Sequence, residues 1–167
     1  MEATKSAVLN LLVDAYQRRD RVGLVSFRGD SAELLLPPTG SVELAQVKLR
    51  DLRTGGATPL AHGILRSLEV LEDERRRNET AVPWLVLVTD GRANVGIAGG
   101  LGSEDARAAA AKVRESRVNS LVIDTAGPSG SGAARELARL TGGEYVRLGA
   151  FGGASIAGAV RQHLETS

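Results

Sequence analysis

One carboxylate in this sequence stands where α/β proteins usually carry out their chemistry. Residues 84–89 read Trp-Leu-Val-Leu-Val-Thr, and Asp90 follows them directly, before Gly91. An apolar run without alternation predicts a strand that is buried on both faces, in the middle of a parallel sheet. Ligands bind at the carboxyl edge of such sheets, so Asp90 is a candidate metal ligand or nucleophile. The alternative for Asp90 is a plain Asp-Gly turn.

Thr58 belongs to a helix start signal. Thr58 and Pro59 precede apolar residues at helical spacing, Leu60, Ile64, Leu68 and Leu71. This order predicts a helix with Thr58 as its N-cap and Pro59 as its first residue.

Other candidates carry less weight. Asp124 ends a later predicted strand and could join the same edge, although a loop or cap carboxylate is the more common role. Arg92 is a candidate to orient Asp90 or to meet an acidic partner, with a solvated loop arginine as the alternative. Ser26 and Ser103 have no neighbouring histidine base in the sequence, which gives nucleophilic catalysis no support.

Composition excludes several classes of partner. The 21 basic and 20 acidic side chains nearly cancel, so we expect no nucleic-acid partner and no attraction to anionic membranes. The sequence has no cysteine, which excludes a disulfide framework and a thiolate metal site. No apolar run approaches the roughly 18 residues of a membrane helix. We therefore expect one soluble, cytoplasmic domain over residues 1–167.

The elements that must position these side chains alternate between helix and strand. Periodicity and turn residues predict helices over about 1–18, 41–52 and 133–140, a helix that starts at Thr58-Pro59 and ends near Arg75-Arg76-Arg77, a helix after residues 103–105 with Ala106, Ala109, Ala110 and Val113 on one face, and a final helix containing Ile156, Val160 and Leu164. Strands are predicted over about 21–27, 32–36, 84–89, 118–124 and 144–148. The short link at residues 28–31 makes the first two strands a hairpin, and Pro37-Pro38 is expected to stop the second, near a sheet edge. Ser103-Glu104-Asp105 is expected to cap its helix. The order predicts an α/β, doubly wound, mostly parallel sheet with helices on both faces and one antiparallel edge hairpin.

The residues also carry a family resemblance. The string Leu87-Val88-Thr89-Asp90-Gly91-Arg92-Ala93-Asn94-Val95, with residues 21–29, 32–38 and 55–60 upstream, resembles the von Willebrand A, or integrin I-like, domain at the C-terminus of the magnesium chelatase D subunit. The likeness runs over essentially the whole chain. It implies a non-catalytic interaction module with an AAA+ ATPase subunit and a porphyrin-binding subunit as partners, in porphyrin metal insertion. A cobalt chelatase-type subunit is an alternative within the class.

The resemblance further implies a metal-ion-dependent adhesion site, with Thr58 and Asp90 as two of its ligands. Hydroxyl and carboxylate oxygens on neighbouring loops at a sheet edge suit a hard divalent cation such as Mg²⁺, and a plain N-cap is the alternative for Thr58. The family's Asp-x-Ser-x-Ser motif on the loop after the first, central strand has no match in this sequence. We therefore expect Mg²⁺ binding to be weak or absent. A metal-dependent phosphotransfer enzyme or hydrolase that uses Asp90 is the alternative function, although it needs a second carboxylate and a phosphate-binding loop.

The unmatched motif also carries an expectation for the sheet. By the resemblance the chain begins inside the helix that follows the family's first strand, so Met1 is expected to be an internal methionine or a boundary. That strand would lie between residues 21–27 and 84–89. Because unpaired buried backbone groups are costly, we expect these two strands to pair directly, or the exposed gap to drive self-association.

Overall fold

The computed structural model describes residues 2–52, 56–97 and 99–148. In chain order its elements are α1 (Glu2–Gln17), β1 (Val22–Arg28), β2 (Ser31–Thr39), α2 (Val42–Arg50), α3 (Leu60–Arg77), β3 (Trp84–Thr89), α4 (Gly102–Glu115), β4 (Asn119–Asp124), α5 (Gly132–Thr141) and β5 (Glu144–Arg147). The α/β class is confirmed. The expected final helix lies outside the described residues, and no described helix combines the length and apolar character needed to cross a bilayer.

The strands form two hydrogen-bonded groups. The hairpin pairs β1 with β2 antiparallel, and the second sheet has the parallel order β3-β4-β5. In the described part of the chain no ladder joins β1 to β3, so the expected direct pairing of these two strands is wrong. The physical reason is that helices, rather than backbone hydrogen bonds, connect the two groups.

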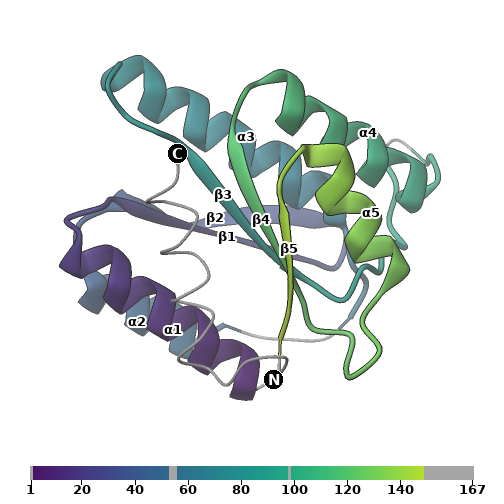
Figure 1. The fold of residues 1–167 in the computed structure, drawn as a ribbon, viewed down its shortest axis with the longest axis horizontal. Coiled ribbons are helices and arrows are strands. Elements are labelled where there is room, and N and C mark those ends of the chain that lie inside the picture. The colour runs from purple at the N-terminus through teal and green to yellow at the C-terminus, as the bar shows by residue number, and fades with distance from the viewer. Residues whose placement is uncertain (1, 53–55, 98, 149–167) are drawn as a thin grey trace.

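Helices cover both faces of the parallel sheet (Figure 1). On one face, Leu85 and Leu87 of β3 belong to the main apolar cluster, which α3, α4 and α5 complete. On the other face, Leu11 of α1 packs against a smaller cluster formed by β4 and β5. The next residue, Leu12, is buried with Leu36 of β2 and with two residues of α2. Adjacent side chains of α1 therefore hold the parallel sheet and the hairpin together from one side.

On the opposite side, α3 makes the same connection. Leu60 and Ile64 are fully buried in the main cluster with β3, while Phe27 of β1 packs against that cluster. Gly63 lies between Leu60 and Ile64 in the sequence of α3. A β-carbon at this position would come 2.7 Å from Cγ of the Phe27 ring. Because real β-carbons do not approach so closely, only glycine lets α3 lie this near to β1.

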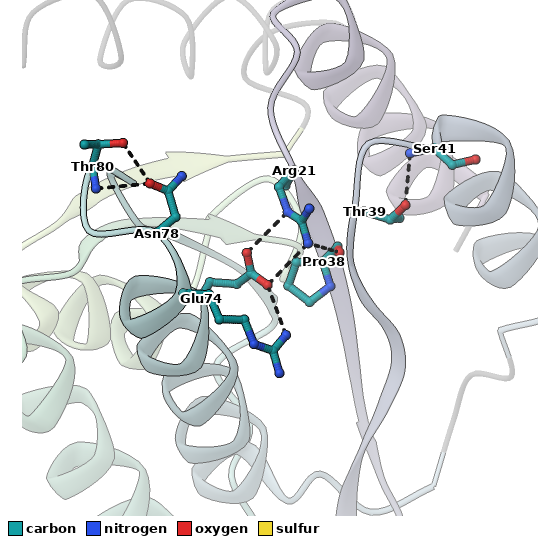
Figure 2. Close-up of polar contacts among 8 residues, drawn as sticks. Arg21, Pro38, Thr39, Ser41, Glu74, Asn78 and Thr80 are labelled. Atoms are coloured by element: carbon teal, nitrogen blue, oxygen red, sulfur yellow. Dashed lines mark hydrogen bonds and ion pairs between the residues drawn. The ribbon is translucent and has the colours of Figure 1, made fainter.

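A polar contact fixes the far end of α3 to the hairpin (Figure 2). Arg21, just before β1, donates from Nη2 to the carbonyl of Pro38 at 2.9 Å, and its Nε lies 3.3 Å from Oε2 of Glu74. Glu74 also faces Arg77 of the same helix, at 3.7 Å. The side chain of Glu74 is mostly buried. Its contact with Arg21 therefore helps to fix the orientation of α3 relative to the hairpin.

Cap residues set the ends of two helices. Ser41 caps α2 by accepting the N–H of Leu44, and Gly142 ends α5 in the left-handed conformation. Two expectations were wrong. Pro37 and Pro38 lie inside β2, which has only β1 as a partner among the described strands, so a missing N–H is tolerated there. The N-cap of α4 is Leu101, without a side-chain bond, and Ser103 lies inside the helix.

The tight contact at Gly63 predicts a clear effect on stability. Gly63→Ala should lower the free energy of unfolding by about 1–3 kcal/mol, because the methyl group forces Phe27 or α3 to move. Gly132→Ala is the matched control, since this helical glycine has no atom within 4 Å of its β-carbon position. That variant should be neutral or up to about 1 kcal/mol more stable. Urea unfolding measures both, and equal stability of the two variants would contradict the account.

Candidate functional site

Asp90 follows β3 and forms a tight turn. Its Oδ1 accepts the N–H of Arg92 at 2.9 Å, and its Oδ2 lies 3.3 Å from Nε of the same arginine. Gly91, at φ +84°, packs against the start of α5, where a β-carbon would lie 3.0 Å from the N of Ala134. The turn role of Asp90 is therefore real. It does not exclude a ligand role, because a carboxylate offers about four lone-pair sites and this side chain is 35% exposed.

A hollow of about 360 Å³ lies beside Asp90. Its lining residues are Thr4, Asp90, Arg92, Thr125 and Ala126. Thr125 belongs there because β3 and β4 end together: Thr89 pairs with Asp124, and the N–H of Thr125 donates to the carbonyl of Thr89 at 2.9 Å. Thr4 comes from the first turns of α1. Neither threonine was identified from the sequence, since only the packing of α1 and the strand register bring them to this edge.

Thr58 is placed differently from its prediction. The N-cap of α3 is Pro59, which has no side-chain cap bond, so the N-cap assignment of Thr58 is wrong. The helix begins one residue later than expected, at Leu60, which leaves the Thr58 hydroxyl without a capping role. The backbone N–H of Thr58 instead donates to Oδ1 of Asn94, at 2.7 Å. This bond ties the Thr58 loop to the Asp90 loop, although Thr58 is not a lining residue of the hollow.

Asp124 has a structural role in the loop after β4. The residue is fully buried, and its carboxylate accepts the N–H groups of Ala126 and Ser131 and the hydroxyl of Tyr145, the last at 2.7 Å. Arg135 lies 5.3 Å from the centroid of the Tyr145 ring, and hydrogen bonding to Tyr145 raises the pKa of Arg135 above its ordinary value. Asp124 is therefore a loop carboxylate, the more common of the two roles considered for it, and it does not line the hollow.

The donor set of the hollow fits a hard cation in kind but not in number. Asp90 supplies a carboxylate, and Thr4 and Thr125 supply hydroxyls. Mg²⁺ needs six oxygen ligands, of which water usually provides several. In the described ranges no three acidic or histidine side chains gather where they could hold a metal ion. A cation here would keep most of its waters or take ligands from elsewhere.

The sequence and the fold both match known proteins. A family model described as the von Willebrand factor type A domain matches residues 1–92. An uncharacterized protein of Methanocaldococcus jannaschii, MJ0910, is 40% identical over 150 residues, which cover 89% of this chain and 86% of that protein. The magnesium-chelatase 60 kDa subunit of Cereibacter sphaeroides is 44% identical over 153 residues, 89% of this chain. The match covers 27% of that subunit, so the chain spans about a quarter of its length.

A solved structure supports the fold independently. The crystal structure of the SpRpn10 VWA domain superposes with a TM-score of 0.70 over 95% of this chain and 82% of that one. Its sequence is 14% identical. At this identity the likeness concerns the fold alone.

The hydrogen bond from Tyr145 to the buried carboxylate of Asp124 can be tested by substitution. Tyr145→Phe removes the phenol that donates to Asp124, and the free energy of unfolding should fall by about 1.5–3 kcal/mol, the usual loss for a hydrogen bond to a charged group. Tyr16→Phe is the control, because Tyr16 is 56% exposed, and its effect should stay within about 0.5 kcal/mol. Thermal or urea unfolding decides the matter. A Tyr145→Phe variant as stable as the control would show that Asp124 does not depend on this bond.

Proposed function

The chain belongs to the von Willebrand factor type A domain family, as its motifs predicted, and we propose that it is a non-catalytic interaction module of a metal-chelatase type of complex. In this proposal the Asp90 edge docks an AAA+ ATPase partner subunit. A porphyrin-binding subunit completes the complex. The 44% identity to a magnesium-chelatase subunit over most of this chain supports the class of complex.

The observation that carries the docking role is the set of groups around the hollow. Asp90 stands half-exposed at the carboxyl edge of the sheet, and Thr4 and Thr125, which carry hydroxyl groups, line the same hollow. Arg92 is 79% exposed and uses only its Nε toward Asp90. The carboxylate and the hydroxyls suit a cation that also accepts a carboxylate from a partner, because such a cation lacks a complete shell from this chain. The guanidinium of Arg92 does not favour a cation, and its role in this proposal is to meet an acidic group of the partner. In this proposal Asp90 and Thr4 or Thr125 would hold the cation. Thr58 does not line the hollow, and only the family resemblance makes it a candidate ligand.

No part of this arrangement supplies a nucleophile and a base. Asp90 already accepts the N–H of Arg92 and pairs with its guanidinium, and the described acidic side chains do not converge with it on one point. A phosphotransfer enzyme or hydrolase would need a second carboxylate near Asp90. We therefore favour binding over catalysis for this edge of the sheet.

The incomplete donor set predicts weak cation binding. Mg²⁺ should bind with a dissociation constant of about 1 mM or weaker, since the chain offers few of the six oxygens and Mg²⁺ gives up water reluctantly. Calorimetry with Mg²⁺ measures this. Asp90→Ala should abolish whatever binding exists, and Asp73→Ala is the control, because Asp73 also pairs with an arginine in the following turn but lies on α3. Micromolar affinity that is lost in Asp90→Ala would show that the site is more complete than proposed.

The docking role predicts a loss of partner binding without a loss of fold. Thr58→Ala and Asp90→Ala should each weaken association with the ATPase subunit by on the order of tenfold, about 1.4 kcal/mol of binding free energy. Binding assays beside circular dichroism test this, with Asp73→Ala as the control. If both variants bind like the control, the interface lies elsewhere on the molecule.

A further inference from the structure

Four large apolar side chains stay exposed on α1 and α2. On α2, Leu44 is 52% exposed and Val47 is 48% exposed, and on α1 the exposed residues are Val13 and Tyr16. Each pair is spaced by three residues, so its two members share one face of their helix. The buried residues of α2 lie on the opposite face of that helix. We call Val13, Tyr16, Leu44 and Val47 the α1/α2 face.

The two helices that carry this face lie side by side (Figure 1). Near the start of α1, Nζ of Lys5 donates to the carbonyl of Arg50 at the end of α2, at 3.3 Å. Near the end of α1, Tyr16 lines one small crevice with Val42, the first residue of α2. The helices are therefore antiparallel neighbours. Monomeric soluble proteins rarely expose a large apolar patch, and such a patch commonly marks an interaction site.

Charged side chains of α2 border its exposed apolar pair in a definite order. Glu43 and Arg50 are both exposed and lie seven residues apart, so they stand on the same flank of the helix. If a second α2 packed antiparallel on this face, Glu43 of each copy would meet Arg50 of the other. A parallel neighbour would instead place like charges together. The face is therefore complementary to itself about a two-fold axis.

We propose that the α1/α2 face is the interface of a homodimer in which the two α2 helices pack antiparallel. Leu44 and Val47 form the apolar centre of this interface, and the two α1 helices meet beside it through Val13 and Tyr16. A second copy is the occupant because the opposite charges along one flank match the same flank in reverse order, which is the requirement of a two-fold contact. The interface uses none of the residues that line the hollow beside Asp90, so the proposal is independent of the docking function.

Sedimentation of the full chain over a range of protein concentrations tests the dimer. The wild-type chain should show a reversible equilibrium between monomer and dimer. Val47→Lys should raise the dissociation constant of the dimer by about tenfold or more, because it places a charge at the apolar centre of the interface. Val82→Lys is the matched control, since Val82 is 70% exposed but precedes β3, and it should leave the constant unchanged.

Two charge reversals test the antiparallel arrangement. Glu43→Arg alone should raise the dissociation constant by on the order of tenfold, because each flank contact then joins two positive groups. Arg50→Glu alone should act in the same way by joining two negative groups. An equimolar mixture of the two variants should form a heterodimer about as tightly as the wild type, because every flank contact again joins opposite charges. Circular dichroism of each variant shows whether the fold is kept.

Several results would overturn the proposal. One is a wild-type chain that stays monomeric at concentrations up to about 1 mM. Another is a dimer that Val47→Lys leaves intact, because the contact would then lie on a different surface, such as an edge of the sheet. Single reversals that weaken the dimer without recovery in the mixture would contradict the antiparallel two-fold contact, and the proposal would fall with it.

Discussion

The packing of α3 between the hairpin and the parallel sheet is the constraint on which the rest of this structure depends. Leu60 and Ile64 are fully buried, and burial of each such side chain contributes roughly 1.5–3 kcal/mol. Gly63, one residue before Ile64, lets Phe27 of β1 approach the helix axis. Since no described ladder joins the two groups of strands, this close contact, together with Leu11 and Leu12 on α1, holds them in one body.

The candidate site depends on helix packing and on strand register. The first residues of α3 hold Pro59 and so fix Thr58, while α1 brings Thr4 to the carboxyl end of β3. The register between β3 and β4 brings Thr125 to the same hollow as Asp90. The loops themselves contribute little stability, which is usual for binding sites that a rigid scaffold positions.

Two carboxylates at the same sheet edge take different roles because their surroundings differ. Asp124 is buried, and two backbone N–H groups and a phenol satisfy its oxygens. Asp90 is half-exposed, and both of its contacts are with one residue, Arg92. It accepts the backbone N–H of Arg92 and pairs with its guanidinium. A buried carboxylate with three donors organises a loop, whereas an exposed one paired with a surface arginine is weakly held and can exchange partners.

The sequence by itself determined the class of fold, the order of elements and the place of Asp90, because these depend on local periodicity and on the abrupt end of one apolar run. It also carried the family resemblance in residues 87–95. Only the tertiary structure decided the rest. Thr58 looked like an N-cap from its neighbours, yet its N–H is held by Asn94, 36 residues away, and α3 begins at Leu60. Thr4 and Thr125 give no local signal at all, since their meeting at the hollow follows from helix packing and strand register. The separation of β1 from β3 was likewise hidden, because it reflects how helices pack across both groups of strands, a property that no single segment encodes.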